Sequence, residues 1–167
     1  TVNGLTTQGD PGLQPERGPT WELGGERRGS NDKLTATLFE NRLSNLIYLK
    51  QVVPLVLSQR INAASAKVRG IELAATTELG DGLTLKAHYA YIESQMLENS
   101  ADPQSVGKRL TDSPKNLGGI TLSARQGDWT GALDARYASH AYATARNTDV
   151  LEGVPTSYDA YTLVDAK

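Results

Sequence analysis

Hydrophobic and polar residues alternate along several stretches of the chain, and the clearest alternation lies in Leu83–Glu93. Side chains two residues apart point to the same side of a β-strand, so this period gives one apolar and one polar face. The first face carries Leu83, Leu85, Ala87, Tyr89 and Tyr91, and the second carries Thr84, Lys86, His88 and Ala90. Helical periodicity is weak along the chain. The pattern therefore predicts an all-β protein.

The same alternation recurs in Trp129–Tyr137 and Ile71–Thr76 and is less decisive in 161–164. Leu34–Phe39 is apolar on both sides, so the pattern leaves its faces open. We expect an antiparallel meander of about seven long strands. They are predicted near residues 17–28, 32–47, 58–79, 82–95, 108–125, 129–142 and 157–166.

Short and long connections alternate between these strands. Glycine-rich and polar clusters predict short turns at Arg28–Asp32, Gly80–Gly82 and Gln126–Asp128. Longer polar connections are expected at roughly Leu49–Leu57, Gln95–Gly107 and Ala141–Ser157. Short turns at one end and long loops at the other are typical of an outer-membrane β-barrel. A soluble β-sandwich shows the same alternation of residues and remains an alternative.

Aromatic residues lie near the ends of the predicted strands, where amphipathic rings meet a membrane interface. Trp129 and Tyr137 are eight residues apart on one face, a separation of about 26 Å, which is close to the height of an apolar membrane band. In a soluble sandwich these rings would be core residues instead. The predicted interface aromatics are Trp21, Tyr89, Tyr91, Trp129, Tyr137 and Tyr161.

The composition excludes several other classes of protein. The 167 residues are 38% hydrophobic and 22% charged, which argues against disorder, and the net charge of -2 leaves no basic stripe for nucleic acid. Cysteine is absent. The longest apolar run, Val52–Leu57, contains Pro54 and is too short for a membrane-spanning helix.

No combination of residues predicts catalysis. His88 and His140 lie on different predicted strands without a nucleophile pattern, and the GKR segment at Gly107–Arg109 lacks the upstream glycine of a phosphate-binding loop. We therefore expect neither an enzyme nor a bound cofactor or metal. A single His88 can be a ligand for iron or haem, but the alternative is a solvated polar residue.

Two groups of residues are candidates for binding. For the side chains on the predicted polar face there are two interpretations. They either pair with one another and contact a plug, or bind substrate directly. That face carries Glu72, Lys86, His88, Asp134 and Arg136. The long connections concentrate possible ligand contacts, and the alternative for each residue there is an ordinary hydrophilic loop residue. The loop candidates are Tyr48, Tyr142, Arg146, Asp149 and Tyr158.

Ordered sequence blocks resemble TonB-dependent receptors over nearly the whole chain. The blocks are LQPERGPTWELGGE, LFENRLSNLI and NAASAKVRGIELAATTELGDGLTLKAHYAYIES, followed by GKRLTDSPKN, GDWTGALDARY and GVPTSYDAYTLVDAK. The resemblance implies a barrel of about 22 strands with a plug domain in its lumen. The chain would then be a fragment of the barrel domain, residues 1–167, without the plug and the remaining strands.

The resemblance also implies a location and a function. The protein would lie in the outer membrane of a Gram-negative bacterium, contact the lipid bilayer and its own plug, and work with the periplasmic TonB coupling protein. Its expected cargo is a scarce ligand such as a ferric siderophore, imported by active transport. A passive porin or structural barrel remains an alternative, as does a soluble secreted β-sandwich that binds a ligand.

Overall fold

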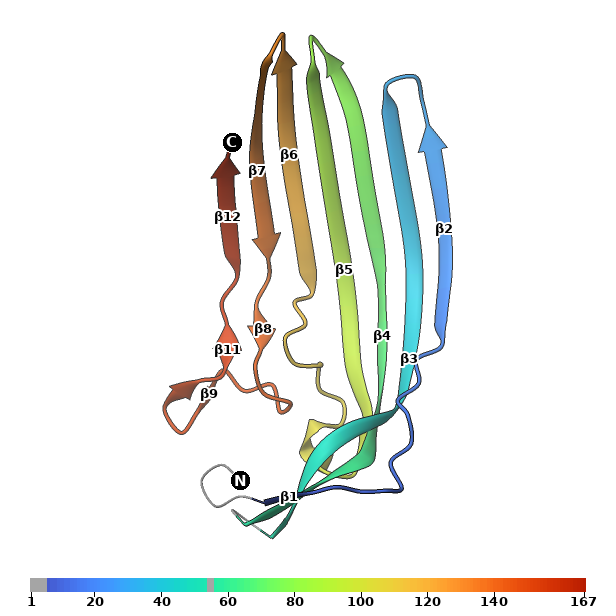
Figure 1. The fold of residues 1–167 in the computed structure, drawn as a ribbon, viewed down its shortest axis with the longest axis vertical. Coiled ribbons are helices and arrows are strands. Elements are labelled where there is room, and N and C mark those ends of the chain that lie inside the picture. Colours follow the sequence, from blue (N-terminus) through green and yellow to red (C-terminus); the bar gives the residue numbers. More distant parts are fainter. Residues whose placement is uncertain (1–5, 54–55) are drawn as a thin grey trace.

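A single curved sheet makes up most of the computed structural model, which describes residues 6–53 and 56–167. Seven strands pair antiparallel in chain order, with β2 and β12 at the two edges (Figure 1). They are β2 (Thr20–Arg28), β3 (Asp32–Val53), β4 (Leu57–Gly80), β5 (Leu83–Asn99), β6 (Asn116–Gln126), β7 (Trp129–Ala138) and β12 (Tyr161–Ala166). The predicted seven-stranded meander is confirmed.

Smaller elements lie around this sheet. Strand β1 (Thr6–Gln8), which the sequence did not predict, pairs in parallel with the start of β4 and is an addition to the antiparallel meander. The other elements are the short helix η1 (Pro103–Ser105) and the antiparallel pairs of β8 (Ala141–Tyr142) with β11 (Ser157–Tyr158) and of β9 (Val150–Leu151) with β10 (Val154–Pro155). Among the described residues, no helix has the length and hydropathy to cross a membrane.

The three short turns lie at the same end of the sheet, as predicted (Figure 1). Between β4 and β5 the chain reverses through Asp81 and Gly82, whose φ angles are 49° and 77°. Two successive positive φ angles match the twist of an antiparallel hairpin. The β6–β7 hairpin instead uses Gly127, with φ 60°, at its first central position. Glycine and aspartate therefore set the register of both hairpins.

The opposite end differs from the predicted long connections. The connection predicted at 49–57 is mostly strand, because β3 and β4 stay paired from Leu49 to Val53 through local register shifts. Pro54 and Leu55 of this prediction lie outside the described residues. The other two connections are longer than predicted and span residues 100–115 and 139–160. Pro114 has no N–H to donate to a ladder, and β6 begins only at Asn116.

The strand register joins the apolar positions into one continuous face, which we call the apolar face. Leu73 lies opposite Ala36 and Tyr89, and the series continues across β6 to β7. The ambiguous segment 34–39 is now assigned, since Leu34 and Leu38 share the apolar face with Ala36. Its members on the central strands include Leu34, Ala36, Leu38, Ile71, Leu73, Ala75, Leu85, Ala87, Tyr89, Tyr91, Ile120, Leu122, Leu133, Ala135 and Tyr137.

Phe39 lies on the other, polar face, where its ring covers Gly70. A methyl group built on Gly70 would stand 2.8 Å from Phe39 Cζ, closer than side-chain carbons approach. A ring that covers a glycine on the neighbouring strand protects backbone that has no side chain of its own. This pair explains an aromatic residue on an otherwise polar surface.

Very little of the sheet is buried. Among the described residues, the hydrophobic core cluster consists of the buried Ala64, Ala66 and Met96 and lies near the loop end. On the apolar face Trp129 is 83% and Leu133 54% exposed. An apolar surface of this extent is not stable in water and needs a covering layer.

Candidate functional site

The polar face carries an ion network that joins its last three strands. Arg136 on β7 donates from Nε to Asp134 Oδ1 and from Nη2 to Asp165 Oδ2 on β12, both at 2.7 Å. Thr121 on β6 donates to Asp134 Oδ2, also at 2.7 Å. Sequence analysis predicted Asp134 and Arg136 but missed Thr121 and Asp165, which only the strand register identifies. One guanidinium thus binds two carboxylates, which leaves the network with a net negative charge.

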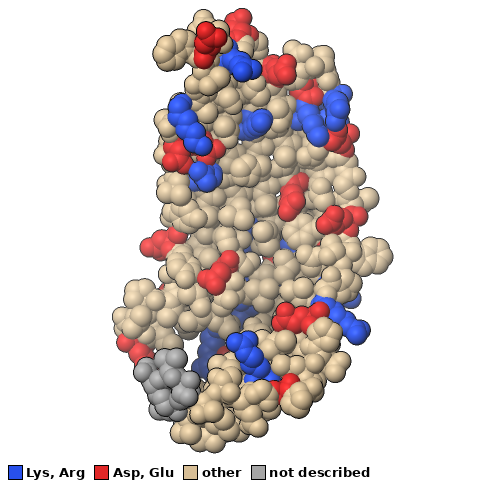
Figure 2. All heavy atoms as spheres, in the orientation of Figure 1, with Lys and Arg blue, Asp and Glu red and all other residues tan. Residues whose placement is uncertain are grey.

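The remaining three polar-face candidates also lie on this side of the sheet. Glu72, Lys86 and His88 occupy alternate positions on β4 and β5, and the His88 imidazole covers Gly119 on β6. No group of three possible metal-binding side chains occurs in the described parts of the chain. In Figure 2, charged side chains gather toward both ends of the visible surface and thin out across its middle. A role of these residues in plug contact or substrate passage stays a prediction.

The two long connections bind each other at the loop end. Arg146 forms a two-pronged ion pair with Asp102, with Nε–Oδ2 and Nη2–Oδ1 distances of 3.2 Å. The side chain of Asn147 accepts from the Arg109 backbone N–H at 2.7 Å and donates to the Arg109 carbonyl at 3.0 Å. These contacts connect residues 100–115 to residues 139–160. The loops therefore form one ordered cluster.

Tyr142 lies at the centre of this cluster. The Arg109 guanidinium lies 5.9 Å from the centre of its ring, within the range of a cation–π contact. The His140 ring meets it edge-on at 4.7 Å, and His140 Nε2 lies 2.9 Å from Asp149 Oδ1. Sequence analysis named Tyr142 and Asp149 but missed His140 and Arg109 as their partners. No local pattern relates Arg109 to a connection more than thirty residues away, and His140 meets both residues only through the fold of its own connection.

Of the other two loop candidates, Tyr48 lies beside the loop cluster and Tyr158 lies outside it. Tyr48 on β3 packs against the core cluster, and burial together with the nearby charge of Asp102 raises the pKa of its hydroxyl. Tyr158 belongs to β11, pairs with Ala141 and is 55% exposed. The structure thus brings Tyr142, Arg146 and Asp149 together and leaves Tyr158 outside. Ligand contact by any of the five remains a prediction.

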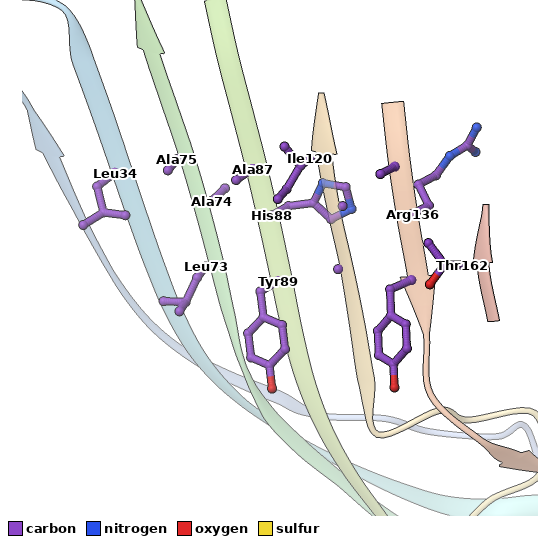
Figure 3. A pocket seen from close by; sticks show the side chains of 14 residues that line it. Leu34, Leu73, Ala74, Ala75, Ala87, His88, Tyr89, Ile120, Arg136 and Thr162 are labelled. Carbon is purple, nitrogen blue, oxygen red and sulfur yellow. The ribbon is translucent and has the colours of Figure 1, made fainter. Parts of the chain in front are cut away.

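Five of the six predicted interface aromatics share the apolar face, whereas Tyr161 does not. Tyr161 pairs with Ala138, whose register position belongs to the polar face. Tyr89 and Tyr137 flank Gly118 on the apolar face, and Tyr89 Oη donates to Asn116 Oδ1 at 2.7 Å. Small residues between these rings leave a shallow apolar hollow of about 540 Å³ (Figure 3). Its lining includes Leu73, Ala87, Tyr89, Gly118, Ile120 and Tyr137.

The sequence matches a known family along its full length. The family model described as TonB dependent receptor-like, beta-barrel matches residues 1–167. A ferrioxamine B receptor of Salmonella typhimurium is 29% identical over 160 residues, covering 92% of this chain and 21% of that receptor. An uncharacterized TonB-dependent receptor of Haemophilus influenzae is 26% identical over 162 residues, covering 93% of this chain and 46% of that protein. The chain therefore spans less than half the length of these relatives.

Solved structures share the fold. The ferric citrate transporter FecA in its unliganded form superposes with a TM-score of 0.75 at 22% identity, covering 91% of this chain and 23% of the transporter. The FrpB iron transporter of Neisseria meningitidis gives a TM-score of 0.72 at 16% identity, with coverages of 97% and 25%. The seven-stranded meander is thus the same arrangement as a part of each of these barrels.

Proposed function

Because the chain belongs to the β-barrel family of TonB-dependent receptors, we propose that it forms part of an outer-membrane receptor importing a ferric siderophore. The family consists of receptors and transporters rather than enzymes. The ferrioxamine B receptor is one of its relatives, so ferrioxamine B is the first cargo to test. Import would be coupled to energy through a plug domain and the periplasmic TonB protein.

The observation that carries this proposal is the two-sided sheet. On the apolar face, Trp129 and Tyr137 are about 26 Å apart along β7, close to the height of the apolar band of an outer-membrane barrel. Beyond Tyr91 the same face becomes charged, beginning with the Arg69–Glu93 ion pair. A soluble sandwich would cover its apolar face with a second large sheet, and the only other sheets in the described residues are two pairs of two-residue strands within the connection 139–160.

The polar face would then line the lumen. The Asp134–Arg136–Asp165 network and the neighbouring Lys86 and Glu72 are suited to a wet interior in contact with a plug. The loop cluster around Tyr142 would lie at the outer mouth, since short turns face the periplasm in barrels of this kind. Incoming cargo would meet these loops first.

Uptake by cells that express the full-length receptor tests this function. A strain lacking its own ferrioxamine uptake is supplied with the gene, and accumulation of ⁵⁵Fe from ferrioxamine B and from ferric citrate is followed. We expect accumulation that requires both the gene and TonB. Accumulation that is equal in a strain without TonB would identify a passive pore, and no accumulation from either complex would refute siderophore import for these cargoes.

A further inference from the structure

Rows of charged side chains begin directly beyond the loop-side limit of the apolar face. Across β3, β4 and β5 the register aligns Glu40, Arg69 and Glu93 in one row. Each lies two residues beyond an apolar-face member, namely Leu38, Ile71 and Tyr91, so the row shares the same face. In the next row Arg42 stands opposite Lys67, which pairs with Gln95.

These rows border a small polar pocket of about 180 Å³, which we call the basic pocket. Its charged lining residues are four cations, Lys67, Arg69, Arg109 and Lys115, and one carboxylate, Glu93. The Glu93 carboxylate is already bound by Arg69, with Nη2–Oε2 at 2.6 Å and Nε–Oε2 at 2.8 Å. Neither Lys67 nor Lys115 forms an ion pair with any described carboxylate, and the buried Nε of Arg109 has no hydrogen-bond partner there. The pocket therefore carries an uncompensated positive charge.

A second hollow adjoins the basic pocket toward the apolar face. Leu38, Ile71 and Tyr91 line it, and it shares Arg69 and Glu93 with the basic pocket. Its walls are mostly apolar. The Arg69–Glu93 ion pair borders both hollows, so a molecule that places an anion among the cations can lay a hydrocarbon chain past this pair and along the adjoining hollow.

We propose that the basic pocket binds the phosphate group of a membrane lipid whose acyl chain lies against the apolar face. The proposal rests on the proposed function in one respect, namely that the apolar face contacts lipid. Lysine ammonium groups act as point charges for phosphate, and arginine offers N–H groups in a planar fork. The pocket lies where the hydrocarbon layer gives way to headgroups, so a lipid phosphate arrives at the correct depth. A free phosphate would use the cations but not the adjoining hollow.

Native mass spectrometry of the full-length receptor in dodecyl maltoside tests this site. The probes are dioleoyl phosphatidic acid, dioleoylglycerol and inorganic phosphate, which carry phosphate with chains, chains alone and phosphate alone. The test variant is K67Q/K115Q. The matched control is K50Q, because Lys50 is an exposed lysine further along β3 and does not line the pocket. Resistance to unfolding by sodium dodecyl sulfate without heating verifies that each variant is assembled.

Wild type and K50Q should bind phosphatidic acid and not dioleoylglycerol, and binding should weaken about tenfold for each lysine removed, as for a lost charged hydrogen bond. Equal binding by assembled K67Q/K115Q, or equal binding of dioleoylglycerol, overturns the site. Binding of inorganic phosphate as tight as that of phosphatidic acid overturns the lipid assignment. The siderophore uptake assay is read independently, so loss of the lipid site leaves the transport function intact, and the converse also holds.

Discussion

Replacement of Leu133 by arginine should strongly weaken assembly of the barrel in a membrane. Leu133 lies four residues from both Trp129 and Tyr137, so it stands about 13 Å from each and near the middle of the apolar band. Its side chain is 54% exposed in the protein alone, and in a bilayer that surface contacts hydrocarbon. Arginine at the midplane of a barrel costs about 2 to 4 kcal/mol, a shift of roughly 30-fold to 1000-fold in the folding equilibrium.

The matched control is Ala132→Arg, because Ala132 is the neighbouring residue and faces the polar side. It lies near Asp134 and Asp165, so an arginine there enters a wet, partly acidic surface and should cost less than about 1 kcal/mol. The full-length receptor is refolded into phosphatidylcholine vesicles across a urea series, and the folded fraction is read from its mobility in unheated gels. Equal free energies of unfolding for the two variants would falsify the assignment of the apolar face to lipid.

Three further outcomes follow from the turns and the loop cluster. Gly82→Ala should lower the free energy of unfolding by roughly 1 kcal/mol or more, since Gly82 has φ 77° and an added methyl group would collide with the Arg125 carbonyl. An unchanged urea midpoint would contradict the turn geometry. Tyr142→Ala removes the contacts to both Arg109 and His140, so a protease should cleave residues 139–160 faster than in wild type. An unchanged rate of cleavage would show that the ring does not order the loops. An epitope inserted after Gly153, in the exposed β9–β10 turn, should bind antibody on intact cells. An epitope inserted after Asp81 should bind antibody only when the outer membrane is permeabilised, and labelling there on intact cells would show the opposite orientation of the barrel.

The sequence predicted strand faces well and loop structure poorly, for a physical reason. The direction of a strand side chain depends on local parity, so the alternation in Leu83–Glu93 and Trp129–Tyr137 sufficed to place Leu85 and Leu133 on one face. Parity gives no answer where adjacent positions are both apolar, as at Leu38 and Phe39, and the pairing of Leu38 with Ile71 was needed to assign the faces there.

Loop contacts depend instead on segments far apart in the chain. Arg146 was a candidate for binding ligand, yet its guanidinium pairs with Asp102, which is 44 residues away in the sequence. Tyr161 was placed with the interface rings because it lies near a predicted strand end, but its pairing with Ala138 places it on the other face. The connection predicted at 49–57 was also partly wrong, since residues 49–53 continue β3 and pair with β4.

The near absence of a buried core has a consequence for how this sheet holds its shape. A globular domain buries an apolar interior of its own, whereas the hydrophobic cluster of the described residues has three buried members, Ala64, Ala66 and Met96. In the described sheet, the two edge strands β2 and β12 each leave one side of their backbone without a partner strand. Alone in water, the described sheet would expose unpaired backbone N–H and C=O groups at both edges and an apolar surface on one face. Copies would then associate edge to edge. Its conformational stability is a property shared with lipid and neighbouring strands, so a melting temperature for this segment would describe its surroundings as much as its sequence.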